Sequence, residues 1–172
     1  MTDTSTLVGI ASARRARRAR AGRRVFLALI FLMVLAGLAT QLGVRSRTAQ
    51  VVEHGYRLRV TYAAVTRPGL DTPFIVEVGA AKTLPKELTI GVDLAYVDLF
   101  DENGGLNPEV SSSSADERFV YWTFDTNDTN TFKVSLDAIL ATAQQWGRGA
   151  TVKLIVDKKT VAATNIHTWV LP

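Results

Sequence analysis

The residues of this chain that could act as nucleophiles, bases or metal ligands are few and scattered. The sequence contains no cysteine, and its two histidines, His54 and His167, lie far apart along the chain. Neither a thiol nucleophile nor a paired-histidine metal site is therefore expected. The four serines at 111–114 lack the glycine-flanked elbow that presents the nucleophile of a serine hydrolase. We predict a protein that is not an enzyme and that has no catalytic residues, metal site or cofactor.

The segment 125–130 carries Asp, Asn and Thr side chains at a spacing similar to the oxygen ligands of a calcium-binding loop. However, Asn130 occupies the position of the turn glycine in such a loop, and Leu136 occupies that of the bidentate glutamate. We therefore interpret the segment as a hairpin turn, because these side chains readily hydrogen-bond to nearby backbone groups.

A polar stretch at 101–118 is the strongest candidate for a binding region. Loops of this length in compact domains are usually functional or disordered. This one could be a contact surface for a partner, a weak site for a divalent cation, or a solvated insertion. The predicted partner-binding residues are its acidic side chains, Asp101, Glu102, Glu109, Asp116 and Glu117. If these do not bind, the next candidate is a sheet face with Arg57, Arg59 and Lys153.

The elements that must position these residues begin with a basic segment and a long apolar one. Residues 1–24 have a net charge of 7 − 1 = +6, and residues 25–44 form a run of twenty uncharged, mostly apolar residues. Such a run can span about 30 Å of hydrocarbon as a helix, and flanking arginines favour the cytoplasmic side. We expect 25–44 to be a transmembrane signal anchor with a cytoplasmic N-terminus. The topology determinants are Arg14, Arg15, Arg17, Arg18, Arg20, Arg23 and Arg24.

The rest of the chain has the opposite charge. Residues 48–172 carry 11 basic and 15 acidic residues, a net charge of −4, so the basic isoelectric point belongs to the N-terminal tail. We expect the tail to contact anionic lipid headgroups of the bilayer. We do not expect nucleic-acid binding, because a basic run is its sole sign in the sequence.

The apolar segment has a second interpretation. Residues 22–27 resemble a twin-arginine export signal, and small residues at 37–39 would suit cleavage near Ala39. A run of arginines makes such a match common by chance, so we favour an uncleaved anchor; both interpretations place the folded region outside the cytoplasm. Small residues along one side of the helix form a candidate packing face, which comprises Ala36, Ala39, Thr40 and Gly43.

The folded region, 55–172, alternates apolar and polar residues between turns, which is typical of half-buried strands. Strands are predicted at 56–62, 74–78, 88–96, 120–124, 132–136, 152–156 and 161–170, with Trp122 in the core. Helical spacing predicts a helix over 137–146, and the aperiodic segment 45–54 is expected to be a juxtamembrane linker. We predict an all-β fold, an immunoglobulin-like antiparallel β-sandwich of about seven strands with one short helix, preceded by a single N-terminal transmembrane helix.

These features together predict a single-pass, membrane-anchored protein whose folded domain lies outside the cytoplasm and acts by binding. The function expected first is that of a non-catalytic subunit or assembly factor of a cell-envelope complex, with a membrane or envelope protein as partner. The alternative is a module that binds a small molecule, a cation or an envelope polymer.

Overall fold

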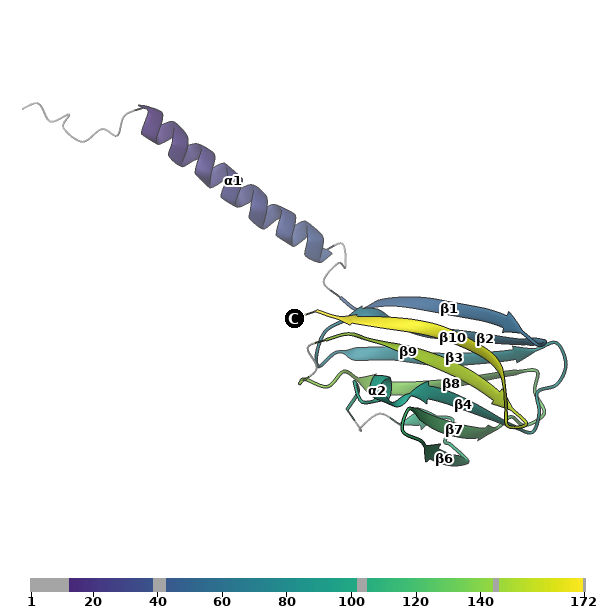
Figure 1. Cartoon of the computed structure of the whole chain (residues 1–172). Coiled ribbons are helices and arrows are strands. Elements are labelled where there is room, and N and C mark those ends of the chain that lie inside the picture. The colour runs from purple at the N-terminus through teal and green to yellow at the C-terminus, as the bar shows by residue number, and fades with distance from the viewer. Residues whose placement is uncertain (1–12, 39–42, 102–104, 144–145, 172) are drawn as a thin grey trace, which may run out of the picture. The chain divides into compact units, whose positions relative to one another are not determined.

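The computed structural model describes residues 13–38, 43–101, 105–143 and 146–171, and the chain divides into two compact units, Met1–Leu42 and Gly43–Pro172. In the first unit, helix α1 runs over Ala13–Leu38 (Figure 1). Alanine, arginine and leucine, which dominate this segment, are strong helix formers. The side chains at 18–37 are exposed.

Helix α1 covers part of the predicted transmembrane segment 25–44. Its described length joins the arginine-rich segment to only the first fourteen residues of the apolar one. Within the described part of the chain, no helix is both long enough and apolar enough to cross a membrane, so the predicted transmembrane helix is not found there. Of the predicted packing residues, Ala36 and Gly43 are exposed, whereas Ala39 and Thr40 lie outside the described residues.

The second unit consists mainly of β-strands, as Figure 1 shows. Its one described helix, α2, is a single turn at Leu94–Val97. The strands are β1 (Arg45–Glu53), β2 (Tyr56–Thr66), β3 (Asp71–Ala80), β4 (Glu87–Asp93), β5 (Leu106–Asn107), β6 (Ser112–Ala115), β7 (Phe119–Asp125), β8 (Thr131–Ile139), β9 (Arg148–Val156) and β10 (Lys159–Val170).

The ten strands form one curled sheet in the order β5-β8-β3-β2-β10-β9-β4-β7-β6, with β1 paired to β2 outside this path. A short parallel pairing, Trp169↔Val65 and Val170↔Thr66, connects β10 to β2 and so joins two five-stranded groups. The other strand pairs are antiparallel. The predicted all-β class is confirmed. The predicted sandwich of about seven strands is not confirmed, because nine strands follow one hydrogen-bonded path and β1 joins it through β2.

The core is formed by alternate side chains of strands from both five-stranded groups. In β2, Leu58 and Val60 are fully buried, whereas Arg57 and Arg59, which alternate with them, are exposed. Most of the buried apolar side chains of both groups belong to one cluster. Trp122 of β7 is 7% exposed and belongs to this cluster, which confirms its predicted place in the core.

A tight turn is present at 125–130, but the predicted hairpin is not. Asn127 and Asp128 have φ of 51° and 54°, and the amide of Thr129 donates to the carbonyl oxygen of Thr126 at 3.3 Å. After glycine, Asn and Asp are the residues that most readily adopt a positive φ. The turn joins β7 to β8, but β7 pairs with β4 and β6 whereas β8 pairs with β3 and β5. It therefore connects the two five-stranded groups rather than two paired strands.

Two predicted boundaries in the first half of the unit are wrong. Residues 45–54 were expected to be a linker, but they form β1, which pairs with β2 from Arg45↔Val65 to Glu53↔Tyr56. Most of their side chains are exposed, so β1 lacks the apolar alternation by which a strand is recognised. The strand predicted at 88–96 ends at Asp93, and the chain then turns into α2, where Tyr96 becomes buried.

The helix predicted at 137–146 is also wrong for the described residues in that range. Strand β8 continues to Ile139, which pairs with Asp71 of β3. Beyond it, the amide of Leu140 donates to the carbonyl oxygen of Leu70 at 3.2 Å, and its own carbonyl oxygen accepts from the amide of Gly69 at 2.8 Å. Backbone pairing with a neighbouring strand thus outweighs a local helical spacing, which is a weak preference.

Candidate functional site

The structure separates the acidic side chains of 101–118 into two places. Asp101 and Glu109 line a cavity, whereas Asp116 and Glu117 lie at the turn between β6 and β7. Glu102, the remaining predicted binding residue, lies outside the described residues. The acidic loop is therefore not one continuous surface.

The cavity has a volume of about 670 Å³ and combines an apolar lining with carboxylates. Its apolar walls include Phe100, Leu106, Val110, Trp122 and Leu136. Its carboxylates belong to Asp98, Asp101 and Glu109, and the described lining contains no lysine, arginine or histidine. We call this hollow the acidic cavity. A cavity of this size and composition is typical of binding sites.

Strand pairing holds the apolar wall of the acidic cavity in place. Strand β5 pairs with β8 through Leu106↔Leu136, so two lining side chains stand beside each other. The amide of Asp101 donates to the carbonyl oxygen of Ile139 at 2.9 Å and fixes that acidic residue against the end of β8.

A buried hydrogen-bond chain anchors α2 behind the cavity. Tyr96 is 1% exposed, and its hydroxyl lies 2.9 Å from Oγ1 of Thr168 in β10. Thr168 Oγ1 in turn donates to the carbonyl oxygen of Ala63 in β2 at 2.7 Å, so the Tyr96 hydroxyl is the donor to Thr168. Burial raises the pKa of Tyr96 to about 12, although the hydrogen bond with Thr168 acts in the opposite direction. The Phe100 ring packs edge-on against Tyr96, with 5.4 Å between ring centroids, and connects this anchor to the cavity wall.

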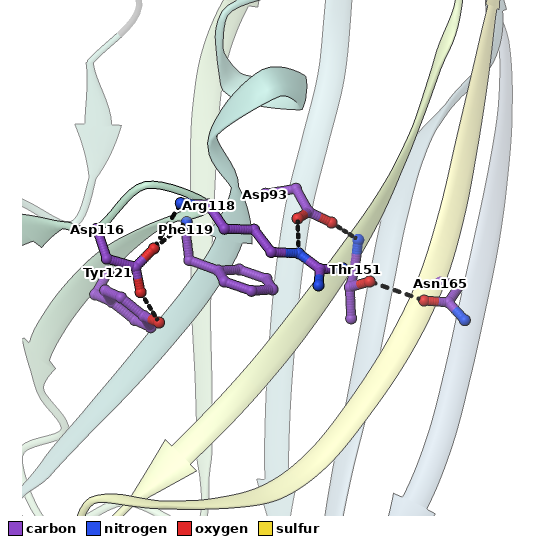
Figure 2. Close-up of polar contacts among 7 residues, drawn as sticks. All are labelled: Asp93, Asp116, Arg118, Phe119, Tyr121, Thr151 and Asn165. Carbon is purple, nitrogen blue, oxygen red and sulfur yellow. Dashed lines mark hydrogen bonds and ion pairs between the residues drawn. The ribbon is translucent and has the colours of Figure 1, made fainter.

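Asp116 organises the turn between β6 and β7 (Figure 2). Its Oδ1 accepts hydrogen bonds from the backbone amides of Arg118 at 2.7 Å and Phe119 at 2.6 Å, and its Oδ2 accepts one from the Tyr121 hydroxyl at 2.7 Å. These bonds, led by that of the Phe119 amide, lower the pKa of Asp116. The Tyr121 pKa is raised, chiefly by the same hydrogen bond to Asp116. The carboxylate thus has three partners within its own turn.

Beside this turn, Asp93 at the end of β4 contacts both the turn and strand β9, as Figure 2 shows. Its Oδ1 accepts from Nε of Arg118 at 3.2 Å, and its Oδ2 accepts from the Thr151 amide at 2.6 Å. The Thr151 hydroxyl donates to Oδ1 of Asn165 at 3.1 Å and extends the chain to β10. This network could not be recognised from the sequence, because its members come from four separate strands or turns.

Two cationic side chains lie close to the Phe119 ring. The Lys153 ammonium lies 3.7 Å from the Phe119 ring centroid, and the Arg118 guanidinium carbon lies 5.1 Å from it. Such cation–π contacts are favourable by about 0.5–1 kcal/mol at exposed positions. The neighbouring Tyr121 ring lies over Gly91, where an added Cβ would stand 3.1 Å from a ring carbon. A larger residue at this position would require the Tyr121 ring to shift by a few tenths of an ångström.

The basic sheet face expected as the second candidate is not one site. Arg57 and Arg59 line a hollow of about 350 Å³ together with Lys133 and Glu77, and Arg59 forms an ion pair with Glu77 at 3.5 Å. Lys153 instead lines the hollow beside Asp116 and Phe119.

Among the described residues, no three His, Cys, Asp or Glu side chains are placed to hold a metal ion together. His54 donates one hydrogen bond, from Nδ1–H to the carbonyl oxygen of Val161 at 2.9 Å, and His167 packs edge-on against Trp169 with 4.6 Å between ring centroids. The described arrangement offers an apolar cavity with acidic groups, which is suited to binding. No protein-family model matches this sequence, and comparison with curated proteins gave no match either.

Proposed function

We propose that this chain is a non-catalytic binding protein that holds a basic, partly apolar segment of a partner protein in its acidic cavity. The observation that carries the proposal is the lining of that cavity: carboxylates of Asp101 and Glu109 beside apolar walls, with no basic side chain among the described lining residues. Opposite charge steers the encounter and excludes acidic partners. The apolar walls supply the contact area that gives affinity.

The size of the cavity agrees with an occupant of this kind. A volume of about 670 Å³ accommodates a few side chains but not a folded domain. A lysine or arginine followed by apolar residues would place its cation near Asp101 or Glu109 and its apolar part near Val110 and Trp122. The Trp122 ring suits either part of such a segment, because an aromatic face packs against apolar groups and also attracts cations.

We further propose that the chain is a single-pass protein anchored in a membrane, with its folded unit outside the cytoplasm as an accessory subunit or assembly factor of a cell-envelope complex. Support comes from the sequence, in which seven arginines precede the uncharged run at 25–44. The finer architecture that we propose for the folded unit is two opposed layers, as in an immunoglobulin-like sandwich. Support comes from the two five-stranded groups, which bury their side chains in a single core cluster.

The cavity proposal is tested by co-purification from mild detergent. The variant Asp101→Asn/Glu109→Gln keeps the shape of both side chains and removes both charges. Recovery of the partner should fall by roughly tenfold, and its salt dependence should weaken, since charge-assisted contacts are lost. The matched control is Glu87→Gln/Asp157→Asn, which removes two exposed charges at the opposite strand ends and should leave recovery unchanged. Equal recovery with both variants would contradict the proposal.

A second candidate is a small organic cation, because the cavity volume also lies within the range of small-molecule sites. The probe is an alkyltrimethylammonium ion, titrated while tryptophan fluorescence is recorded in a Trp146→Phe/Trp169→Phe background. Saturable quenching of Trp122 that disappears in Asp101→Asn/Glu109→Gln would favour this candidate. A signal that persists in that variant would exclude the cavity as the site.

A further inference from the structure

Exposed apolar side chains of the folded unit are concentrated at one end of its strands. Among the described residues of this unit, the large apolar side chains that are exposed are Val52, Leu70, Ile139, Trp146, Trp169 and Leu171. All except Val52 lie where β2, β8 and β10 end and β3 and β9 begin. This is also the end at which the unit's first strand, β1, begins at Arg45 (Figure 1).

Backbone contacts fix these residues at that end. Trp169 pairs with Val65 near the end of β2, and the amide of Leu171 donates to the carbonyl oxygen of Thr66 at 2.9 Å. Gly147, next to Trp146, packs so closely on β10 that an added Cβ would lie 2.8 Å from the Trp169 Cα. Trp146 and Trp169 are therefore near neighbours along the backbone of adjacent segments.

Trp146 and Trp169 expose large apolar rings, and contact of such rings with water is unfavourable. Trp146 is 81% exposed and Trp169 is 63% exposed, although the third tryptophan of the chain is buried. Exposed apolar clusters usually mark surfaces that bind something. Tryptophan in particular concentrates where a membrane meets water, because its ring is apolar and its indole N–H is polar.

Basic side chains surround this tryptophan pair. Arg45 and Trp169 both pair with Val65, and Arg148 pairs with Thr168, the residue before Trp169. Arg47 follows on β1, and all three arginines are exposed. The ion pairs within the described residues, Arg59 with Glu77 and Arg118 with Asp93, use none of the three.

Acidic residues at the same strand ends lie on other strands. Asp71 begins β3, Asp137 is near the end of β8, and Asp98 and Asp101 follow α2. The ends of β1, β9 and β10 therefore form a basic and aromatic surface, which we call the tryptophan end and define by Arg45, Arg47, Trp146, Arg148, Trp169 and Leu171.

We propose that the tryptophan end docks onto the headgroup layer of an anionic lipid bilayer, with Trp146 and Trp169 inserted at the interface and the arginines on lipid phosphates. This inference rests on the proposed membrane attachment, which would keep the start of β1 close to the bilayer. Charge complementarity selects this occupant: arginines bind phosphate groups well, and anionic lipids concentrate such groups in a plane.

The test uses the full chain reconstituted into vesicles of phosphatidylglycerol and phosphatidylcholine whose acyl chains carry bromine, a short-range quencher of tryptophan. Flotation followed by alkaline carbonate extraction measures anchoring, and quenching measures docking. Wild-type emission should contain a quenched fraction that disappears in Trp146→Phe/Trp169→Phe, because the remaining Trp122 is buried. Arg45→Gln/Arg47→Gln/Arg148→Gln should reduce quenching at least threefold, whereas Lys82→Gln/Lys86→Gln/Lys159→Gln, with the same charge change at other strand ends, should not.

Each outcome separates docking from anchoring. Protein that resists carbonate but shows no quenching would overturn the docking surface and leave the anchor intact. Quenching of protein that carbonate releases would support docking and overturn the anchor. Equal quenching on pure phosphatidylcholine would overturn the role of the arginines. A second copy would be the occupant if sedimentation in detergent showed dimers that Trp146→Phe/Trp169→Phe dissociates, and absent quenching would then overturn the lipid proposal.

Discussion

Removing the hydroxyl of Tyr96 should destabilise the folded unit by about 1 kcal/mol, because one buried hydrogen bond is lost. In Tyr96→Phe the ring keeps its packing against Phe74 and Phe100. Thr168 still donates to the carbonyl oxygen of Ala63, so only the acceptor capacity of its hydroxyl is left unused. The cost should therefore be small for a residue that is 1% exposed.

Removing the hydroxyl of Thr168 should cost more, although its side chain is smaller. Thr168→Val leaves both the Tyr96 hydroxyl and the carbonyl oxygen of Ala63 without their partner in a buried place. Each such group costs about 1–3 kcal/mol, which gives about 2–6 kcal/mol for the variant. Adding Tyr96→Phe to Thr168→Val removes one of the two unpaired groups, so the double variant should be no less stable than Thr168→Val alone.

The buried hydroxyl of Tyr96 also predicts that the stability of the folded unit depends on pH in the alkaline range. Folding raises the pKa of Tyr96 from 10.0 to about 12, so its contribution to stability is complete below pH 10 and is lost as pH rises through the folded value. Two pKa units correspond to at most about 3 kcal/mol. Between pH 10 and pH 12 the wild type should lose this much more stability than Tyr96→Phe does.

Urea unfolding of the wild type, the two single variants and the double variant measures the two losses of stability and the pH dependence. Unfolding is followed by far-ultraviolet circular dichroism at pH 7 and above pH 10. The slope of free energy against urea should not change among them, since the exposed surface is the same. If the two single effects added in the double variant, the hydroxyl of Tyr96 would not be bonded to Thr168. An unchanged alkaline profile in Tyr96→Phe would show that the phenol is accessible to water, and the placement of α2 behind the acidic cavity would then be wrong.

Three further changes test other parts of the fold by the same unfolding measurement. Trp122→Ala should cost about 3–5 kcal/mol, because a large buried ring is removed; a loss below about 1 kcal/mol would contradict its burial. Asp116→Asn should destabilise the unit at pH 7, and since its folded pKa is lowered, the difference from wild type should shrink as pH falls below about 4; a constant difference would refute this. Gly147→Ala should cost about 1–3 kcal/mol or more, because the new Cβ would overlap the carbonyl oxygen of Thr168; wild-type stability would show that the segment packs elsewhere.

Strands with regular alternation could be predicted from the sequence. Leu58 and Val60 alternate with Arg57 and Arg59, and the structure buries the first pair and exposes the second. The turn at Asn127 was also predictable, because its residue type suits a positive φ, although the pairing of the two strands that it joins was not. In both cases the information lies within a few neighbouring residues.

Features decided by distant partners could not be predicted. Strand β1 has few buried side chains and exists through its pairing with β2, and Ile139 remains in a strand because Asp71 is opposite. The acidic cavity shows the same limit. Asp101, Glu109 and Asp116 were predicted to act together because they are close along the chain. In the structure, Asp101 and Glu109 line the cavity, whereas Asp116 accepts hydrogen bonds within the turn between β6 and β7.

The measurement that tests the central claim most directly is photocrosslinking from inside the acidic cavity. A photoreactive amino acid replaces Val110, a half-buried lining residue, or Val52, an exposed control on β1. The account predicts an adduct from position 110 whose crosslinked peptide, identified by mass spectrometry, is basic and partly apolar. That adduct should be lost when Asp101→Asn/Glu109→Gln is added. An adduct at position 110 that is indifferent to these charges, or adducts from position 52 alone, would contradict the assignment of the cavity as the binding site.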